Sequence, residues 1–395
     1  MRITGLRGQQ IHGGVVILPW LDRKTIPALA GKIQSGRVAE ASSYGERHGD
    51  QFSGGDFIKR YGDLFKNIID LENIYAAYRN ARRGKGWQNT VKRFEENLDE
   101  NLISIQQSLK NHTFTTASYR SKTIYEPKQR EIYILPFAPD RIVQHALMLV
   151  IEPIWESLFI DTSFACRKGK GLHAGSLKTM EYVRRNKYCL KCDISKFYPS
   201  VRHDILSDLV RRKIKCLETL WLLDDIINSF PGETNVPIGN YTSQWFGNLY
   251  LNELDMFVKH NLKCRDYLRY CDDFCLFADD KEYLNECARQ IKKYLWERLK
   301  LTYSKCWLFP VSLGVDFLGY RHFPEYILLR KSTAKRVKKR LKNLPKLLRK
   351  GRITIEQFRS SVASTMGWLK WANTYNLQMA IELKKLWEIA NGTVS

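Results

Sequence analysis

The sequence contains no apolar run near the ~20 residues that a membrane-spanning helix needs, which argues against a helical membrane protein. It is also short of acids, because only 41 Asp and Glu face 64 Lys and Arg, for a formal net charge of +23. That excess favours a polyanionic partner, most simply a nucleic acid, with an anionic membrane surface as the weaker alternative. A composition of 44% hydrophobic residues excludes a largely disordered chain.

Cysteine is present without a zinc-binding or disulfide pattern. The nine cysteines are an odd number, scattered mostly through apolar stretches, which is typical of reduced thiols and predicts a cytoplasmic protein. Cys189 and Cys192 form an isolated CxxC with no second pair and no nearby histidine, so we expect buried strand thiols there. Residues 1–55 end in a Gly/Ser-rich stretch and are interpreted as an N-terminal extension of unknown role.

Regular βαβ alternation and internal repeats are also absent. Apolar residues recur at spacings of three and four over 91–110, from Pro139 to Pro153, and over 283–299, which predicts amphipathic helices. Aromatic and apolar runs predict strands, at 188–194, 267–271, 274–278 and 315–320. Strands and helices interspersed in this way indicate an α+β fold and not a doubly wound parallel sheet.

Two adjacent acids stand between two of the predicted strands. Asp272 and Asp273 therefore predict a β-hairpin with carboxylates at its tip, although an ordinary polar turn is the alternative. The next pair, Asp279 and Asp280, fits such a turn that also caps the following helix.

A third acid, Asp193, ends the apolar strand at 188–194. Two strands that each deliver an acid could place three carboxylates at one edge of a sheet, where they would repel one another. Two divalent cations about 3.5–4 Å apart would neutralise them and clamp the attacking and leaving oxygens of a phosphoryl transfer.

These segments resemble the successive palm motifs of a reverse transcriptase. The resemblance is carried by "KCDISKFYPSV", "PIGNYTSQWFGNLYLNELD", "YCDDF" and "FLGY", while "YEPKQREIYILPFAPDRIVQHAL" and "TSFACRKGKGLHAG" resemble the fingers of the bacterial group. It extends from about Tyr61 to the end of the sequence. It implies a right-hand polymerase fold with fingers at 56–187, a palm at 188–322 and a basic helical thumb at 323–395.

The resemblance also implies roles for the acids. Asp193 and Asp272 match the ligands of two Mg²⁺ ions, for which Mn²⁺ is a possible substitute, and Asp273 is the third acid of the motif. The backbone carbonyl of Ile194 is an expected further metal ligand. Lys305 occupies the place of a lysine that could protonate the leaving pyrophosphate.

Other residues match the nucleotide-binding positions of the family. Lys128 and Arg130 correspond to the basic pair that grips the triphosphate, although solvated loop charges are the alternative. Tyr198 corresponds to the steric gate that excludes a 2′-hydroxyl, with plain core packing as its alternative. Three further residues lie in the motif beside the nascent pair: Ile238, Gly239 and Gln244.

Basic residues predict the contacts with nucleic acid. Arg167 and Lys168 lie in a finger-like motif. Between Tyr326 and Arg352 there are twelve Lys and Arg and no acid, so a phosphate backbone would relieve their mutual repulsion. The alternative is that these basic residues form an ordinary solvated face of a helix. The predicted contacts within it are Lys335, Arg336, Lys338 and Lys339.

Within the family, the chain looks most like enzymes of diversity-generating retroelements, since Gly239, Ser243 and Gln244 match their GxxxSQ motif. That lineage implies an RNA template with primer, deoxynucleotides, a cDNA product, and an accessory variability protein that is a basic helical oligomer. It also implies errors at template adenines. A defence-associated or other stand-alone bacterial reverse transcriptase is the alternative. An inactive nucleic-acid-binding scaffold is less favoured, because all three acids are present.

Overall fold

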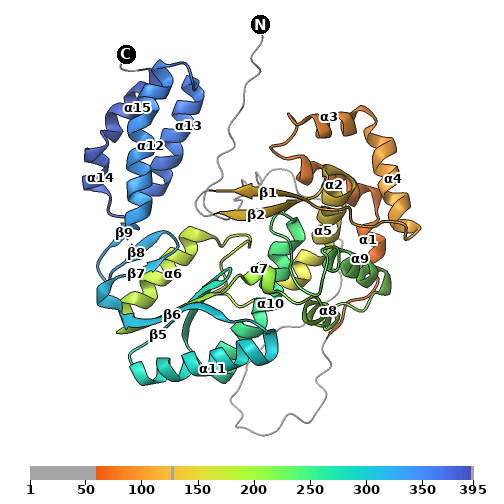
Figure 1. The fold of residues 1–395 in the computed structure, drawn as a ribbon, viewed down its shortest axis with the longest axis horizontal. Coiled ribbons are helices and arrows are strands. Elements are labelled where there is room, and N and C mark those ends of the chain that lie inside the picture. Colours follow the sequence, from red (N-terminus) through yellow and green to blue (C-terminus); the bar gives the residue numbers. More distant parts are fainter. Residues whose placement is uncertain (1–58, 126–128, 393–395) are drawn as a thin grey trace, which may run out of the picture. The chain divides into compact units, whose positions relative to one another are not determined.

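The computed structural model describes residues 59–125 and 129–392, which form an α+β fold with three β-sheets (Figure 1). One compact unit includes residues 121–132, most of a two-stranded sheet. Its strands are β1 (Arg120–Ile124) and β2 (Arg130–Ile134). Residues 60–120 and 133–395 belong to the second unit, which is described from here on. No helix within the described ranges is long and apolar enough to cross a membrane.

The central element of the second unit is a four-stranded sheet in the order β4-β5-β3-β6. All three strand pairs are antiparallel. The strands are β3 (Tyr188–Ile194), β4 (Asp266–Tyr270), β5 (Asp273–Ala278) and β6 (Tyr303–Pro310). A smaller three-stranded sheet follows, with β7 (Val315–Phe317), β8 (Tyr320–His322) and β9 (Ile327–Leu329).

Alternation along the strands gives the four-stranded sheet two different apolar faces. Leu190 and Cys192 of β3 enter the main core, whereas Cys189 enters a smaller cluster with residues of α6 (Leu172–Arg185) and β7. Helix α11 (Lys281–Leu299) packs along β3, β5 and β6 (Figure 1). The predicted CxxC thiols are therefore buried and free, as expected, and point to opposite faces.

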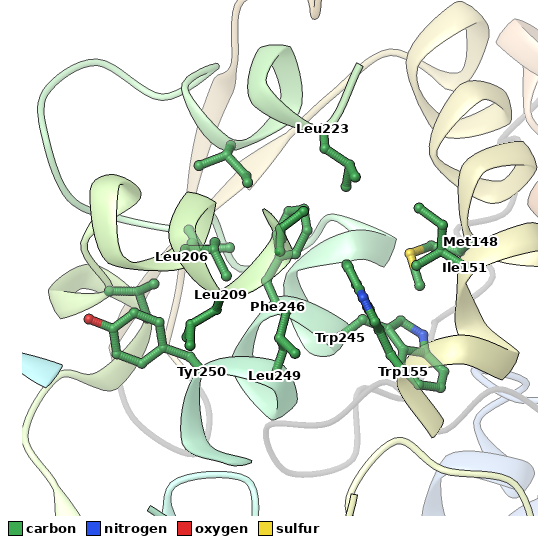
Figure 2. Packing of buried hydrophobic residues seen from close by; sticks show 14 of the residues in the cluster. Met148, Ile151, Trp155, Leu206, Leu209, Leu223, Trp245, Phe246, Leu249 and Tyr250 are labelled. Atoms are coloured by element: carbon green, nitrogen blue, oxygen red, sulfur yellow. The ribbon is translucent and has the colours of Figure 1, made fainter. Parts of the chain in front are cut away.

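The main core is centred on α10 (Tyr241–Met256), a helix with 12 of its 16 residues buried. Figure 2 shows Trp245 and Phe246 of this helix lying among side chains of several other helices, including Trp155. A helix buried on nearly every side has to find partners for its polar side chains as well. Helices α5 (Ile142–Glu156) and α8 (His203–Arg211) pack directly against it. The remaining helices before it in the chain, besides α6, are α1 (Phe65–Ile68), α2 (Leu71–Arg82), α3 (Asn89–Glu96), α4 (Leu98–Lys110), α7 (Phe197–Ser200) and α9 (Leu217–Ile227).

Four helices at the C-terminal end share a separate core (Figure 1). They are α12 (Lys331–Arg349), α13 (Ile355–Leu369), α14 (Tyr375–Ala380) and α15 (Leu383–Asn391). Leu341 and Leu344 of α12 are buried in this core. Most basic residues of the same helix are exposed, whereas Arg340 is half-buried and donates to the hydroxyl of Thr365 on α13.

Three predicted element boundaries are wrong. The helix at 91–110 is two helices, because Asn97 leaves helical geometry with φ −131° and ψ 54°. Pro153 does not stop α5, which continues to Glu156; a proline near the end of a helix disrupts only the last turn. The strand at 315–320 is a hairpin instead, because Leu318 and Gly319 have φ of 55° and 84° and reverse the chain.

Candidate active site at the end of the four-stranded sheet

Asp193 and Asp273 lie directly opposite each other on neighbouring strands. They form the last pair in the register of β3 with β5. Side chains of an opposed antiparallel pair point to the same face, with Cβ atoms roughly 4.5–5.5 Å apart. Both residues are half-buried, so two carboxylates face each other where solvent screens them only in part. The predicted meeting of acids from two strands is thus present for this pair.

The electrostatics of Asp273 reflect that placement. Burial is the main cause that raises the pKa of its carboxyl, and the negative charge of Asp193 raises it further. The positive charges of Lys191 and Arg330 oppose this rise. Ionised Asp273 is therefore held at a cost in free energy, which a cation at this edge of the sheet would reduce.

Asp272 lies in the turn that joins β4 to β5. Tyr270 pairs with Asp273, so that only Cys271 and Asp272 form the turn. Cys271 has φ 54°, a left-handed conformation that L-residues seldom adopt and that short hairpin turns require. The predicted hairpin with carboxylates at its tip is confirmed.

Ser304 is a site residue that the sequence reasoning missed. Its hydroxyl, on β6, donates to a carboxylate oxygen of Asp193 and lies 3.3 Å from the backbone carbonyl oxygen of the same residue. The register between β3 and β6 shifts between Asp193 and Ile194, which opens the ladder at this point. Ser304 therefore orients the Asp193 carboxylate, and only strand pairing across 111 residues brings the two together.

Lys305 lies opposite Asp193 in the β3–β6 register, on the same face of the sheet. Its side chain is exposed, and its Nζ lies 5.1 Å from the centre of the Trp307 ring. The ammonium group is thus held by a cation–π contact beside the acids and within reach of solvent. Its role as a proton donor stays a prediction.

The residues at this edge suit a hard divalent cation. Within residues 59–125 and 129–392, no group of three or more His, Cys, Asp or Glu side chains is arranged closely enough to hold a metal ion. Asp193 and Asp273 nevertheless supply the carboxylate oxygens that Mg²⁺ prefers, and their mutual repulsion fits a bridging positive charge. Ile194, which follows Asp193, is buried, and its backbone lies at the register shift.

Tyr198 lies on α7 near the turn of Cys271 and Asp272. Burial is the main cause that raises its pKa well above the usual value, and the charges of Cys271 and Asp272 contribute. Its ring packs 5.1 Å from that of Phe197 and above Gly247 of α10. A Cβ atom at Gly247 would lie 3.3 Å from a ring carbon of Tyr198, so this glycine, which the sequence reasoning missed, makes room for the tyrosine.

The segment before α10 owes its shape to one glycine. Gly239 has φ 126°, and a Cβ there would lie 2.6 Å from the carbonyl oxygen of Tyr133. The carbonyl of Ile238 accepts a hydrogen bond from the N–H of Tyr133 at 3.3 Å, which fixes the backbone at this point. The hydroxyl of Ser243 donates to the carbonyl of Pro237 at 2.7 Å. The side chains of Ile238 and Gln244 are both half-buried.

The predicted phosphate-binding residues fall into different environments. Arg130 opens β2 and is half-buried, whereas Lys128 lies outside the described residues. Arg167 has a side chain only 5% exposed, which donates to Glu156 and to two backbone carbonyls, so its contacts favour a structural role. Lys168 is 73% exposed and pairs with Glu152 at 2.9 Å.

The four basic residues predicted on the C-terminal helix are exposed on α12. They are Lys335, Arg336, Lys338 and Lys339. Because Leu341 and Leu344 anchor the opposite side of the helix, these charges form a solvent-facing surface.

Comparison with known proteins agrees with this geometry. A family model described as "Reverse transcriptase (RNA-dependent DNA polymerase)" matches residues 126–322, which contain all the acids above. Protein YkfC of Escherichia coli (strain K12) is 26% identical over 235 residues, covering 47% of this chain and 61% of that protein. Group II intron-encoded protein LtrA of Lactococcus lactis subsp. cremoris is 26% identical over 212 residues, covering 49% of this chain and 35% of that protein.

A mitochondrial plant protein is similar over a comparable length. Nuclear intron maturase 4 of Arabidopsis thaliana is 24% identical over 207 residues, covering 50% of this chain and 25% of that protein. The chain therefore spans less than two thirds of the length of each of these three relatives. It carries an RNA-dependent DNA polymerase domain of the reverse transcriptase family at residues 126–322.

Proposed function

We propose that Asp193, Asp272 and Asp273 catalyse RNA-templated DNA synthesis by two-metal nucleotidyl transfer. The observation that carries this proposal is the direct pairing of Asp193 with Asp273 beside the turn that holds Asp272. When bound, two Mg²⁺ ions, or Mn²⁺ in their place, supply the positive charge that activates a primer 3′-hydroxyl and stabilises leaving pyrophosphate. The carboxylates would hold those ions, and Ser304 keeps the Asp193 carboxylate in one orientation.

Other residues of the family motifs would select and retain the nucleotide. Tyr198, packed over Gly247, would exclude a 2′-hydroxyl and so favour deoxynucleotides. Arg130 and Lys128 would bind the triphosphate, because a guanidinium fork can contact two phosphate oxygens. Lys305, held beside the acids, would donate the proton that pyrophosphate takes up on leaving.

In this proposal the four-stranded sheet belongs to the palm at 188–322. The fingers comprise 56–187, and the α12–α15 helices lie in a thumb at 323–395. The exposed Lys and Arg side chains of α12 would bind the phosphate backbone of the template–primer duplex. Replacing Lys335, Arg336, Lys338 and Lys339 with Gln should weaken duplex binding and lower the slope of log K against log salt by about 0.9 for each phosphate that is no longer neutralised.

A matched control for that change lies on another helix of the same core. Lys384 and Lys385 of α15 are also exposed, and their replacement with Gln should leave the salt slope near the wild-type value. Equal slopes for the wild type and the quadruple α12 variant would mean that these basic side chains contact only solvent and do not bind phosphates.

The motif "GNYTSQ" supports a finer assignment to the diversity-generating retroelement lineage. Ile238 stands where more accurate relatives carry glutamine, whose amide could lose a hydrogen bond at a mispair. Such a loss costs about 1–3 kcal/mol, or roughly a ten- to hundredfold penalty on mispairs. Isoleucine has no directional bond to lose, so we expect an error-prone enzyme with errors concentrated at template adenines, working with a basic helical accessory protein.

Sequencing cDNA made on one RNA template tests this lineage. Ile238→Gln should be active and several-fold more accurate at adenine than the wild type. A wild type that copies adenine faithfully, or identical error spectra for both proteins, would refute the mutagenic assignment while leaving the polymerase assignment intact. A stand-alone or defence-associated enzyme is then the better interpretation, and the similarity to YkfC and LtrA is compatible with it.

A further inference from the structure

An ion pair with no solvent exposure connects the core helix to the strand that leads into the catalytic turn. Arg269 of β4 and Asp255 of α10 are both 0% exposed. The Arg269 Nε lies 2.7 Å from Asp255 Oδ1, and its Nη2 lies 2.6 Å from Oδ2. A buried pair of this kind is stable only if the remaining donors and acceptors of both groups are also satisfied.

The remaining hydrogen bonds extend to the turn itself. Nη1 of Arg269 donates to the backbone carbonyl of Cys271 at 3.0 Å and to Asn248 Oδ1 at 3.2 Å. The Tyr267 hydroxyl donates to Asp255 Oδ1 at 2.6 Å. One guanidinium group thus joins α10, β4 and the first residue of the turn.

Arg269 bonds to Cys271 at a point where the backbone conformation is unfavourable. Cys271 has φ 54°, a conformation that costs a residue with a Cβ more than it costs glycine. Asp272 and Asp273 follow immediately, so a small rotation at Cys271 would displace both carboxylates. The Arg269 hydrogen bond to its carbonyl opposes that rotation.

Helix α10 also supports the neighbouring wall of the site. Asn248 and Asp255 are seven residues apart, two turns of the same helix, so both reach Arg269. The residue before Asn248 is Gly247, on which Tyr198 rests. One helix therefore supports both the turn that holds Asp272 and precedes Asp273, and the platform beneath Tyr198.

We propose that Arg269 is a positioning residue that sets the conformation of the catalytic turn, with Asp255 and Asn248 holding its guanidinium. The inference rests on the proposed role of Asp272 and Asp273 in metal binding. Arg269 contacts no substrate in this role; it acts only through the carbonyl of Cys271.

Arg269→Lys is the informative variant, because it keeps the charge opposite Asp255 but cannot bond the aspartate bidentately and reach Cys271 together. We expect at least a tenfold lower rate of primer extension with an unchanged KM for template–primer. We also expect at least threefold weaker Mn²⁺ binding, measured without catalysis from the electron paramagnetic resonance of the free ion.

The matched control lies at the other end of the same strand. Arg185 donates to Asp266, the first residue of β4, with its Nε at 2.6 Å from Oδ2. Arg185→Lys makes the same chemical change far from the turn along β4. It should lower the melting temperature while leaving Mn²⁺ affinity and the extension rate within twofold of the wild type.

A second-site change tests the mechanism. Cys271→Gly in the Arg269→Lys background supplies a residue that adopts positive φ readily, and it should restore Mn²⁺ affinity at least threefold. If Arg269→Lys does not fold, the uncharged pair Asp255→Asn/Arg269→Gln replaces it, with the same expected losses.

Two outcomes separate this inference from the function on which it rests. A folded Arg269→Lys or double variant that binds Mn²⁺ and extends primers like the wild type overturns the positioning role alone. A wild type that binds no Mn²⁺ at the acids and extends no primer on RNA overturns the metal-dependent polymerase assignment, and the positioning role with it.

Discussion

The two ends of β5 carry the same dipeptide and use it in opposite ways. At the end of the strand, Asp279 accepts a hydrogen bond from the backbone N–H of Lys187 at 2.9 Å. Asp280 caps α11, accepting from the N–H of Glu282 at 2.8 Å. At the start, Asp273 faces another carboxylate across the sheet.

The difference lies in what each carboxylate faces. Backbone N–H groups stabilise the ionised form of a capping aspartate, and solvent screens it. Asp273 is half-buried opposite Asp193, and burial raises its pKa. An acid that is costly to ionise where it stands is typical of a functional site, whereas the cap contributes to folding. Four measurements test whether the two ends of β5 differ in this way.

The greatest change is expected in catalysis. Asp272→Asn or Asp273→Asn should reduce primer extension on RNA below detection while RNA binding stays near the wild-type level, because a metal ligand loses its charge. Asp279→Asn and Asp280→Asn are matched controls at the other end of β5 and should retain most activity. Robust extension by an Asp193→Asn/Asp272→Asn double variant contradicts the two-metal assignment.

A second measurement concerns sugar selection beside the acids. Tyr198→Ala should admit ribonucleotides at least about tenfold better relative to deoxynucleotides, a change of about 1.4 kcal/mol, because the ring over Gly247 is removed. Tyr283→Phe is the control near the other end of the sheet, where the hydroxyl donates to the carbonyl of Leu262. If Tyr198→Ala incorporates ribonucleotides and deoxynucleotides in the wild-type ratio, Tyr198 is a core-packing residue and not a steric gate.

Replacing an aspartate should change the free energy of unfolding in opposite directions at the two ends of β5. At the cap, Asp280→Ala should destabilise the protein by about 1 kcal/mol, because two backbone N–H groups of α11 lose their acceptor. Asp280→Asn should be nearly neutral, since Asn caps helices equally well. Chemical denaturation of the three proteins measures the difference, and equal stabilities would mean that the cap adds nothing.

The weakest effect is expected at Asp273, without divalent ions. Because its pKa is raised in the folded state, ionisation opposes folding, and stability is regained as pH falls through the folded pKa. Asp273→Asn should therefore melt at a higher temperature than the wild type at pH 7, and the difference should shrink as the pH falls through the raised pKa of the folded protein toward the unfolded value of about 3.9.

Added Mg²⁺ provides the control for that result. It should raise the melting temperature of the wild type and leave Asp273→Asn nearly unchanged. A variant less stable than the wild type at pH 7 in the absence of metal would show that Asp273 is satisfied by its surroundings, like the acids at the other end of the strand.

Local patterns were sufficient to predict much of this site. The strand at 188–194 matches β3 residue for residue, the hairpin at Asp272 and Asp273 is present, and Asp280 caps α11 as expected. These predictions depend on period-two alternation, short turns and helix caps, which involve residues only a few positions apart. The break at Asn97 and the turn at Leu318 and Gly319 were missed because apolar periodicity continues across both.

The residue types at the site, and the order in which the chain delivers them, follow from the sequence alone: one acid at the end of a strand and two at the tip of a hairpin. The pairing of Asp193 with Asp273, the contact of Ser304 with Asp193 and the burial of Arg269 against Asp255 arise only in the folded chain. Those contacts join strands and helices from distant parts of the chain, and the free energy that selects them comes from burying the shared core around α10. Periodicity along one segment carries no information about which other segment will cover it.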